Sequence, residues 1–275
     1  MDKNIKHNIL VHDKVYKSYN LKHSEIYNDF EQSRLKNLVS EIVSMFNKGK
    51  LGGKLSVLDV GAGTGNLSLK FIELGCYVTA SDVSRKSLEL LKSISNNKNK
   101  IDLVCIDGKD LPFDDNKFDI VCTYSVLHHI PDYLHAIREM VRVAKPGALI
   151  YIDHEASESK WNPNRFLKEY NLITKQSFFE HIWKLIKTRE LFSFQFIKSA
   201  FIKIFIDRKH QREGDIHIWE DDHIEWKEVR ELIKNLNCKI LKEVDYLMYK
   251  PKAVKVYHKY KDICNDTKYI IFRKF

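Results

Sequence analysis

The residues best suited to chemistry are three glycines in the first quarter of the chain. Gly61, Gly63 and Gly65 stand at alternate positions, directly after the apolar, β-prone stretch VLDV. Glycine lacks a Cβ, so it permits positive φ angles and lets a ligand lie against the backbone. A helix that begins just beyond them presents free N–H groups and a partial positive charge. The pattern predicts a buried strand, a ligand-binding turn and a helix start.

Two acids narrow the class of ligand. Asp59 precedes the turn, and Asp82 ends the next apolar run, 17 residues after Gly65. A carboxylate at that strand end can bind two ribose hydroxyls. Asn66 stands where a dinucleotide-binding turn would have its third glycine. Together these residues indicate a nucleoside ligand that carries no phosphates.

Alternating elements must position these residues. The sequence predicts strands at 55–60, 76–81, 101–106, 118–124 and 147–153, and helices near 65–74, 84–95 and 132–144. Such alternation gives a parallel sheet with helices on both faces. Ligands of these sheets bind at the carboxyl ends of the strands, where each proposed binding residue falls.

The flanking segments have patterns of their own. Apolar residues at helical spacing from Ile26 to Phe46 predict an amphipathic helix packed on the sheet. Residues 157–221 begin with a polar stretch to Asn164 and continue with aromatic and apolar residues at helical spacing, and the net charge between Lys160 and Arg212 is +8. Beyond them we expect a helix at 222–236 and strands at 238–247 and 268–275.

Four motifs in order resemble the class I S-adenosylmethionine (SAM) methyltransferases. They are VLDVGAGTG, SDVS, DGKDLPF and FDIVCTYSVLHHI with REMVRVAKPGALIYID, and the similarity covers roughly residues 51–156. Their order resembles the ubiquinone/menaquinone-biosynthesis, or type 11, branch. The resemblance implies an α/β fold: a Rossmann-like, seven-stranded, mostly parallel sheet with helices on both faces, plus a helical insertion. The implied division is an N-terminal helical cover (1–50), a SAM-binding core (51–156), an insertion or lid (157–221) and a C-terminal part of the core (222–275).

The resemblance also implies SAM as the cofactor. The implied cofactor-binding residues are Asp59, Gly61, Ala62, Gly63, Asp82, Val83, Asp107, Gly108 and Ser125. Asp59 would counter the ammonium, Asp82 would accept from both ribose hydroxyls, and Asp107 would accept from the adenine amine. Relatives cover the cofactor with the N-terminal segment, so Tyr16, Tyr19 and Tyr27 are candidates either for contacts near the sulfonium or for helix packing.

A methyltransferase needs a base only if its acceptor must first lose a proton. The candidates near strand ends are His128, His129, His154 and Glu155, and His129 and His154 are the leading choices for catalytic residues. His217 and His223 lie outside the core motifs, where they would line the pocket or the surface.

Several acceptor classes fit the sequence poorly. An Asn-Pro-Pro-Tyr motif after the fourth strand would indicate methylation of exocyclic amines in nucleic acid or protein. This sequence has TYSV there, at 123–126, which argues against that class of acceptor. No Pro-Cys nucleophile follows the fourth strand, and no carboxylate cluster suggests a metal site. We expect a small organic acceptor, apolar or lipid-linked. A nucleic-acid methyltransferase and a SAM-fold protein without transferase activity remain the alternatives.

Composition bears on partners and location. The net charge of +9 permits anionic partners without selecting one. Amphipathic, basic residues 178–206 would form a packed insertion, a substrate lid or a contact with an anionic membrane. The five cysteines form no C-x-x-C pair, and MDKNIKHNIL has no apolar signal region. We therefore expect a cytoplasmic protein, with peripheral contact at the inner membrane face as an option; the oligomeric state is open.

Overall fold

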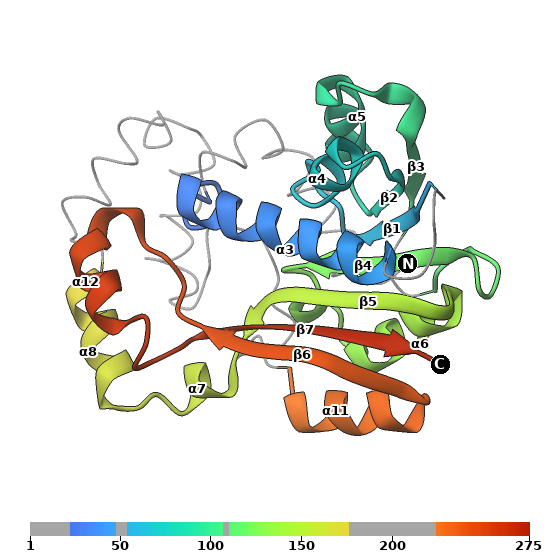
Figure 1. Ribbon diagram of the computed structural model, residues 1–275. Helices are drawn as coiled ribbons and strands as arrows, with labels where there is room; N and C mark the ends of the chain where they lie inside the picture. Colours follow the sequence, from blue (N-terminus) through green and yellow to red (C-terminus); the bar gives the residue numbers. More distant parts are fainter. Residues whose placement is uncertain (1–22, 48–53, 107–109, 176–223) are drawn as a thin grey trace, which may run out of the picture.

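One seven-stranded sheet organises the chain. The computed structural model describes residues 23–47, 54–106, 110–175 and 224–275 (Figure 1). The strand order is β3-β2-β1-β4-β5-β7-β6, and all neighbours are parallel except that β7 runs antiparallel to β5 and β6. The strands are β1 (Ser56–Val60), β2 (Tyr77–Asp82), β3 (Ile101–Cys105), β4 (Phe118–Tyr124), β5 (Ala144–Ala156), β6 (Cys238–Tyr246) and β7 (Thr267–Lys274). The predicted fold class is confirmed.

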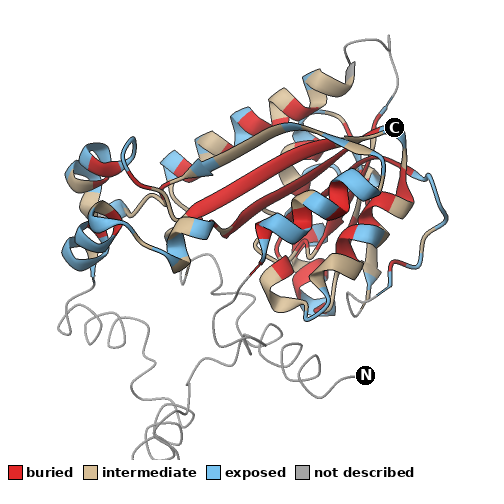
Figure 2. Ribbon diagram, turned by 90° about the horizontal axis from the view of Figure 1, so that it is seen from below, coloured by how far each residue is buried: buried red, intermediate tan, exposed pale blue. Residues whose placement is uncertain are grey.

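Helices cover both faces of the sheet (Figure 1). These helices are α3 (Asp29–Asn47), α4 (Ser68–Glu73), α5 (Arg85–Ile94), α6 (Tyr133–Val143) and α11 (Trp226–Asn235). Apolar residues of α3, α4 and α5 pack on one face, and those of α6 and α11 pack on the other. Figure 2 shows the buried strands between helices that carry exposed residues on their outer faces.

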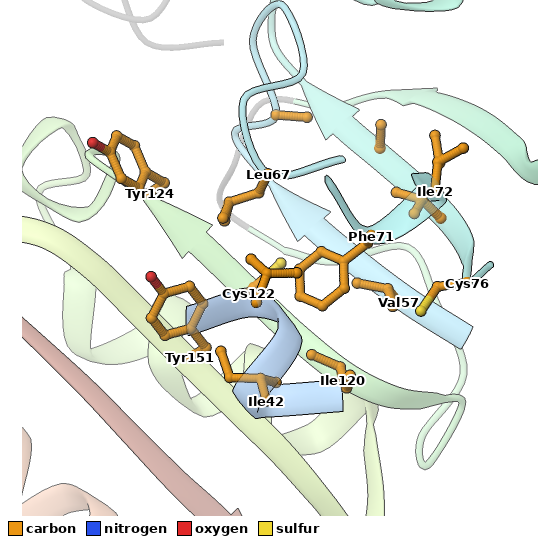
Figure 3. Packing of buried hydrophobic residues seen from close by; sticks show 14 of the residues in the cluster. Ile42, Val57, Leu67, Phe71, Ile72, Cys76, Ile120, Cys122, Tyr124 and Tyr151 are labelled. Carbon is orange, nitrogen blue, oxygen red and sulfur yellow. The ribbon is translucent and has the colours of Figure 1, made fainter. Parts of the chain in front are cut away.

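Alternation along the strands explains the two layers. Val57 and Ile120 face α3 and α4, whereas Leu58 and Val121 face α6 and α11. Because all four side chains are fully buried, the central strands read as continuous apolar runs. Figure 3 shows the first layer, where Phe71 of α4 packs beside residues of β1 and β4.

A third, smaller cluster lies at one end of the sheet. It joins α8 (Arg165–Thr174) to α12 (Val254–Tyr260) through Tyr170, Tyr257 and Tyr260, and short α7 (Glu158–Trp161) precedes α8. The sequence did not predict α8 or α12. Residues 176–223, including the amphipathic stretch 178–206, lie outside the described part. Among the described residues no helix is long and apolar enough to cross a membrane.

Candidate functional site

The glycine turn lies at the carboxyl end of β1. Gly61 has φ +71, and a Cβ there would come within 2.4 Å of Val126 Cγ2, on the turn after β4. Gly63 has φ +52, and no atom lies within 4 Å of the place of its Cβ. Gly61 is therefore required by packing and conformation, whereas Gly63 borders open space in which a ligand has room.

Asp82 at the end of β2 holds this turn. Its Oδ2 accepts the backbone N–H of Gly63 at 2.8 Å, and its Oδ1 accepts that of Ser84 at 2.8 Å. The backbone N–H of Ala62 donates to the Ser81 carbonyl at 2.9 Å, which ties the turn to β2 again. Val83, the next residue of the predicted set, follows directly. A carboxylate oxygen can accept more than one hydrogen bond, so an aspartate at this strand end suits a ligand that carries hydroxyls.

Asp59 is buried beneath the turn. Its Oδ2 accepts from the backbone N–H of Ser68 at 3.0 Å and from the Ser68 hydroxyl at 2.6 Å. These bonds satisfy groups at the first turn of α4, where a negative charge is favourable. Burial raises the pKa of Asp59 to about 6, against the lowering effect of the Ser68 bonds. The described contacts of Asp59 are thus structural, and its contact with an ammonium stays a prediction.

The turn after β4 is held by Glu155 at the end of β5. Oε1 of this buried carboxylate accepts the backbone N–H groups of Val126 at 2.9 Å and Leu127 at 2.8 Å, and Oε2 lies 2.7 Å from His128 Nδ1. An ionised carboxylate only accepts, so Nδ1 of His128 carries the proton. Glu155, one of the predicted base candidates, therefore positions the turn. Ser125 begins this turn with φ +59, and its N–H donates to the Asp153 carbonyl at 2.9 Å.

The two predicted catalytic histidines have different surroundings. The His129 backbone N–H donates to the Val126 carbonyl at 2.9 Å, and its ring centroid lies 4.0 Å from that of His128. His154 is 7% exposed, and its ring stacks on Tyr124 at 4.8 Å. Of the two, only His154 lies in the buried cluster described next.

A polar cluster joins α3 to the ends of β4, β5 and β6. It consists of Glu31, Arg34, Tyr124, Asp153, His154 and Tyr246. Asp153 accepts from Arg34 at 2.8 Å, from the Tyr246 hydroxyl at 3.0 Å and from the Tyr151 hydroxyl. Figure 3 shows Tyr124 and Tyr151 on neighbouring strands at this face of the sheet.

Charges within the polar cluster are mutually paired. Arg34 donates to both oxygens of Glu31, at 2.8 and 2.5 Å. Burial lowers the pKa of Arg34, but Asp153 and Glu31 outweigh it and raise the pKa overall. Burial lowers the pKa of His154, although Glu31 and Asp153 act in the opposite direction. Burial raises the pKa of Tyr124 and Tyr246 well above 10, so both phenols stay protonated near neutral pH.

The start of α3 also contacts the glycine turn. The hydroxyl of Tyr27 lies 3.3 Å from Thr64 Oγ1, and Gln32 Nε2 donates to Asn66 Oδ1 at 2.9 Å. These contacts join the described part of the N-terminal segment to the turn, and its role as a cover for the cofactor stays a prediction. The predicted residues Tyr16, Tyr19, Asp107, Gly108, His217 and His223 lie outside the described residues.

Sequence reasoning missed the charged pair Glu31 and Arg34. A signal for Glu31 was present, because it falls at helical spacing with Leu35, Leu38 and Ile42 on the apolar face of α3. A carboxylate on such a face needs a buried partner, and Arg34 lies one turn away on the same helix.

Comparison with known proteins agrees with the motifs. Residues 58–152 match a family described as a methyltransferase domain. The chain is 33% identical over 167 residues to the demethylmenaquinone methyltransferase of Staphylococcus haemolyticus, covering 60% of this chain and 59% of the relative. It is 40% identical over 96 residues to that of Corynebacterium urealyticum, covering 35% and 40%. The chain thus matches about half the length of these curated relatives, which confirms the resemblance over the core.

Solved structures share the fold. Magnesium protoporphyrin IX methyltransferase from Synechocystis PCC 6803, solved with bound SAM, has a TM-score of 0.55 at 14% identity, covering 100% of this chain and 99% of that one. The cyclase SpnF has a TM-score of 0.50 at 18% identity, covering 88% and 80%. At these identities the likeness concerns the fold alone.

Proposed function

We propose that this chain, whose residues 58–152 match a family described as a methyltransferase domain, transfers the methyl group of SAM to a small, apolar organic acceptor. The observation that carries the proposal is the pairing of Asp82 with Gly63. It sets a carboxylate beside a turn that has open space, at the carboxyl end of a parallel sheet.

The residues present fit SAM. Asp82 would accept from the ribose hydroxyls, the backbone at Gly61 to Gly63 would border the amino acid end, and Ala62, Val83 and Ser125 would complete the described part of the site. Asp107 and Gly108 would contact adenine. Bound SAM supplies a methyl group on a sulfonium, a good leaving group. The chain's own contribution is then to place donor and acceptor in line and to exclude water.

The acceptor class follows from relatives and from the aromatic surroundings. The curated relatives are demethylmenaquinone methyltransferases, whose name specifies a quinone-type acceptor. Phe30, next to Glu31 on α3, stacks on Tyr249 at 4.7 Å and meets Tyr257 edge-on at 5.1 Å. Flat aromatic side chains beside the polar cluster favour a planar, apolar ring. We therefore propose a quinol or phenol as the acceptor.

A labelled methyl group tests this proposal. Purified full-length protein is incubated with methyl-labelled SAM and a short-chain demethylmenaquinol kept reduced with dithionite. We expect label in the organic extract. Label transferred to bulk RNA instead would favour the nucleic-acid alternative. SAM binding without transfer to either would favour a protein with the fold but another reaction, as fold alone does not fix function.

Peripheral membrane contact through residues 178–206 is a separate proposal, supported by the basic, amphipathic sequence of that stretch. Co-sedimentation with anionic vesicles that is lost when 178–206 is deleted would support it. Unchanged co-sedimentation of the folded deletion variant would contradict it.

A further inference from the structure

The hydrogen bonds around His154 fix which ring nitrogen carries a proton. The Tyr124 hydroxyl donates to Glu31 Oε1 at 3.0 Å, and the Tyr246 hydroxyl donates to Asp153 Oδ1 at 3.0 Å. Each phenol has one proton, and each is committed to a carboxylate. Both oxygens also lie near His154 Nδ1, at 3.1 and 3.2 Å, so both must accept from an Nδ1–H group.

The lone pair of the neutral ring is then on Nε2. The structure gives Nε2 no hydrogen-bond partner among the described residues, although His154 is more than nine-tenths buried. Nε2 is not among the fully buried side-chain atoms that lack a partner in the described residues, so this atom borders open space from which a ligand can approach it. The Nε2 atom is therefore a candidate contact for the acceptor.

The backbone holds the His154 ring in an unusual position. His154 has φ +62, and the pairing of β5 with β7 skips between Ile152 and Glu155, which marks a bulge. Bulges re-aim side chains, and such φ values in residues other than glycine cluster at functional sites. Ser125, on the neighbouring strand end, has the same kind of φ and is bonded to Asp153. Strain is thus concentrated where β4 and β5 end together.

This position adjoins the glycine turn. Tyr124 is the register partner of Asp153, and Val126, two residues further, packs against Gly61. The ring of His154 stacks on that of Tyr124 at the end of β4. The chain that follows β4 then borders the proposed cofactor turn.

We propose that His154 Nε2 is the general base of the proposed reaction, taking the proton from an acidic O–H of a phenol or quinol acceptor. This inference rests on the proposed function. The O–H bond breaks and the proton goes to Nε2, while the oxygen keeps the electron pair. The oxygen or the conjugated ring carbon then bonds to the methyl group, and the S–CH₃ pair returns to sulfur. On a ring carbon, loss of the C–H proton to solvent restores the aromatic ring.

The surrounding charges suit a base that alternates between two states. Burial lowers the pKa of His154, so its ring is neutral and proton-accepting near neutral pH. The groups facing it are Glu25 before α3, Glu31 and Arg34 on α3, Tyr124 on β4, Asp153 and Glu155 on β5, and Tyr246 on β6. Once the ring is protonated, Glu31 Oε1 lies 3.9 Å from Nδ1 and stabilises the imidazolium.

The variant His154→Asn separates this role from packing. An asparagine amide can donate from the place of Nδ1 to the two tyrosines, but it has nothing at the place of Nε2. We expect SAM affinity within about twofold of the wild type and transfer to the demethylmenaquinol lowered by about 100-fold or more. A halogenated phenol or quinol that is already ionised at the assay pH should restore most of the rate.

Two matched variants complete the experiment. His135→Asn changes an exposed histidine on α6 and should leave the rate unchanged. His128→Asn keeps a donor to Glu155 and removes the other ring nitrogen. A 100-fold loss in His128→Asn with a normal rate in His154→Asn would overturn the proposal. If the wild-type protein does not bind SAM at all, that result would instead reject the proposed function.

A measurement that needs no acceptor tests whether the lone pair of His154 is on Nε2. Long-range ¹H–¹⁵N correlation spectra of ¹⁵N-histidine protein, assigned by comparison with His154→Asn, report the protonation of each ring nitrogen. We expect a neutral ring with Nδ1–H at pH 7. A proton on Nε2 at that pH would overturn the proposal, whether or not turnover is detected.

Discussion

The backbone N–H of Gly63 donates to Asp82 Oδ2 at 2.8 Å, so the glycine turn after β1 and the carboxylate at the end of β2 hold each other in place. Neither residue could define a ribose site alone. Their contact aligns a carboxylate with backbone that a ligand can approach, before any ligand binds. Preorganisation of this kind lowers the cost of binding.

The variants Gly61→Ala and Gly63→Ala should differ in how they affect folding stability and SAM affinity. At Gly61 the new methyl group meets Val126 and requires φ +71, so we expect loss of both folding stability and SAM affinity. At Gly63 the methyl group meets nothing, so we expect a stability loss of about 1–2 kcal/mol from φ alone, with a large loss of SAM affinity. Thermal unfolding and calorimetric titration measure the two quantities. Normal SAM affinity in folded Gly63→Ala would contradict a ligand beside that residue.

Asp59→Asn should change the pH dependence of stability. Because the folded pKa of Asp59 is raised to about 6, the wild type is relatively most stable at low pH and loses that advantage as pH rises through 6. Asparagine can still accept both Ser68 bonds without a buried charge. Relative to Asp59→Asn, the free energy of unfolding of the wild type should fall by about 3 kcal/mol between about pH 4 and pH 7. Urea unfolding at several pH values tests this, and parallel pH profiles would contradict it.

The sequence predicted the sheet and the cofactor turn better than the acceptor side. Long apolar strands and the spacing of Gly61, Gly63 and Asp82 are local signals, and the predicted strands lie within a few residues of the observed ones. The polar cluster depends on contacts between α3, β5 and β6, which are distant in sequence, so no local pattern indicates that Arg34 reaches Asp153. The role of Glu155 in holding the turn after β4 is hidden for the same reason.

Arg34→Met should destabilise the protein strongly. The change leaves Asp153, which is fully buried, and Glu31 without their cation. Removing one partner of a buried ion pair costs about 3–5 kcal/mol. The control Arg138→Met changes an exposed arginine on α6 and should shift stability by less than about 0.5 kcal/mol. Equal losses in urea unfolding of the two variants would contradict a clamping role for Arg34.

Glu155→Gln should loosen the turn after β4. The amide cannot accept from Val126, Leu127 and His128 together, because one of its two polar atoms is a donor. We expect a stability loss of about 1–3 kcal/mol and weaker SAM binding, since Val126 packs on the glycine turn. Glu89→Gln, on the exposed face of α5, is the control and should behave as the wild type. If Glu155→Gln binds SAM normally and unfolds normally, the proposed positioning is wrong.

Calorimetric titration of SAM into the wild type and Asp82→Ala tests the central proposal most directly. Asp102→Ala, which removes an exposed carboxylate on the neighbouring β3, is the matched control. We expect micromolar-range binding in the wild type and Asp102→Ala, and at least about a 100-fold loss in Asp82→Ala, since two charge-assisted hydrogen bonds disappear. Equal SAM affinity in all three folded proteins, or no binding in any, would contradict the assignment of Asp82 and the glycine turn as the cofactor site.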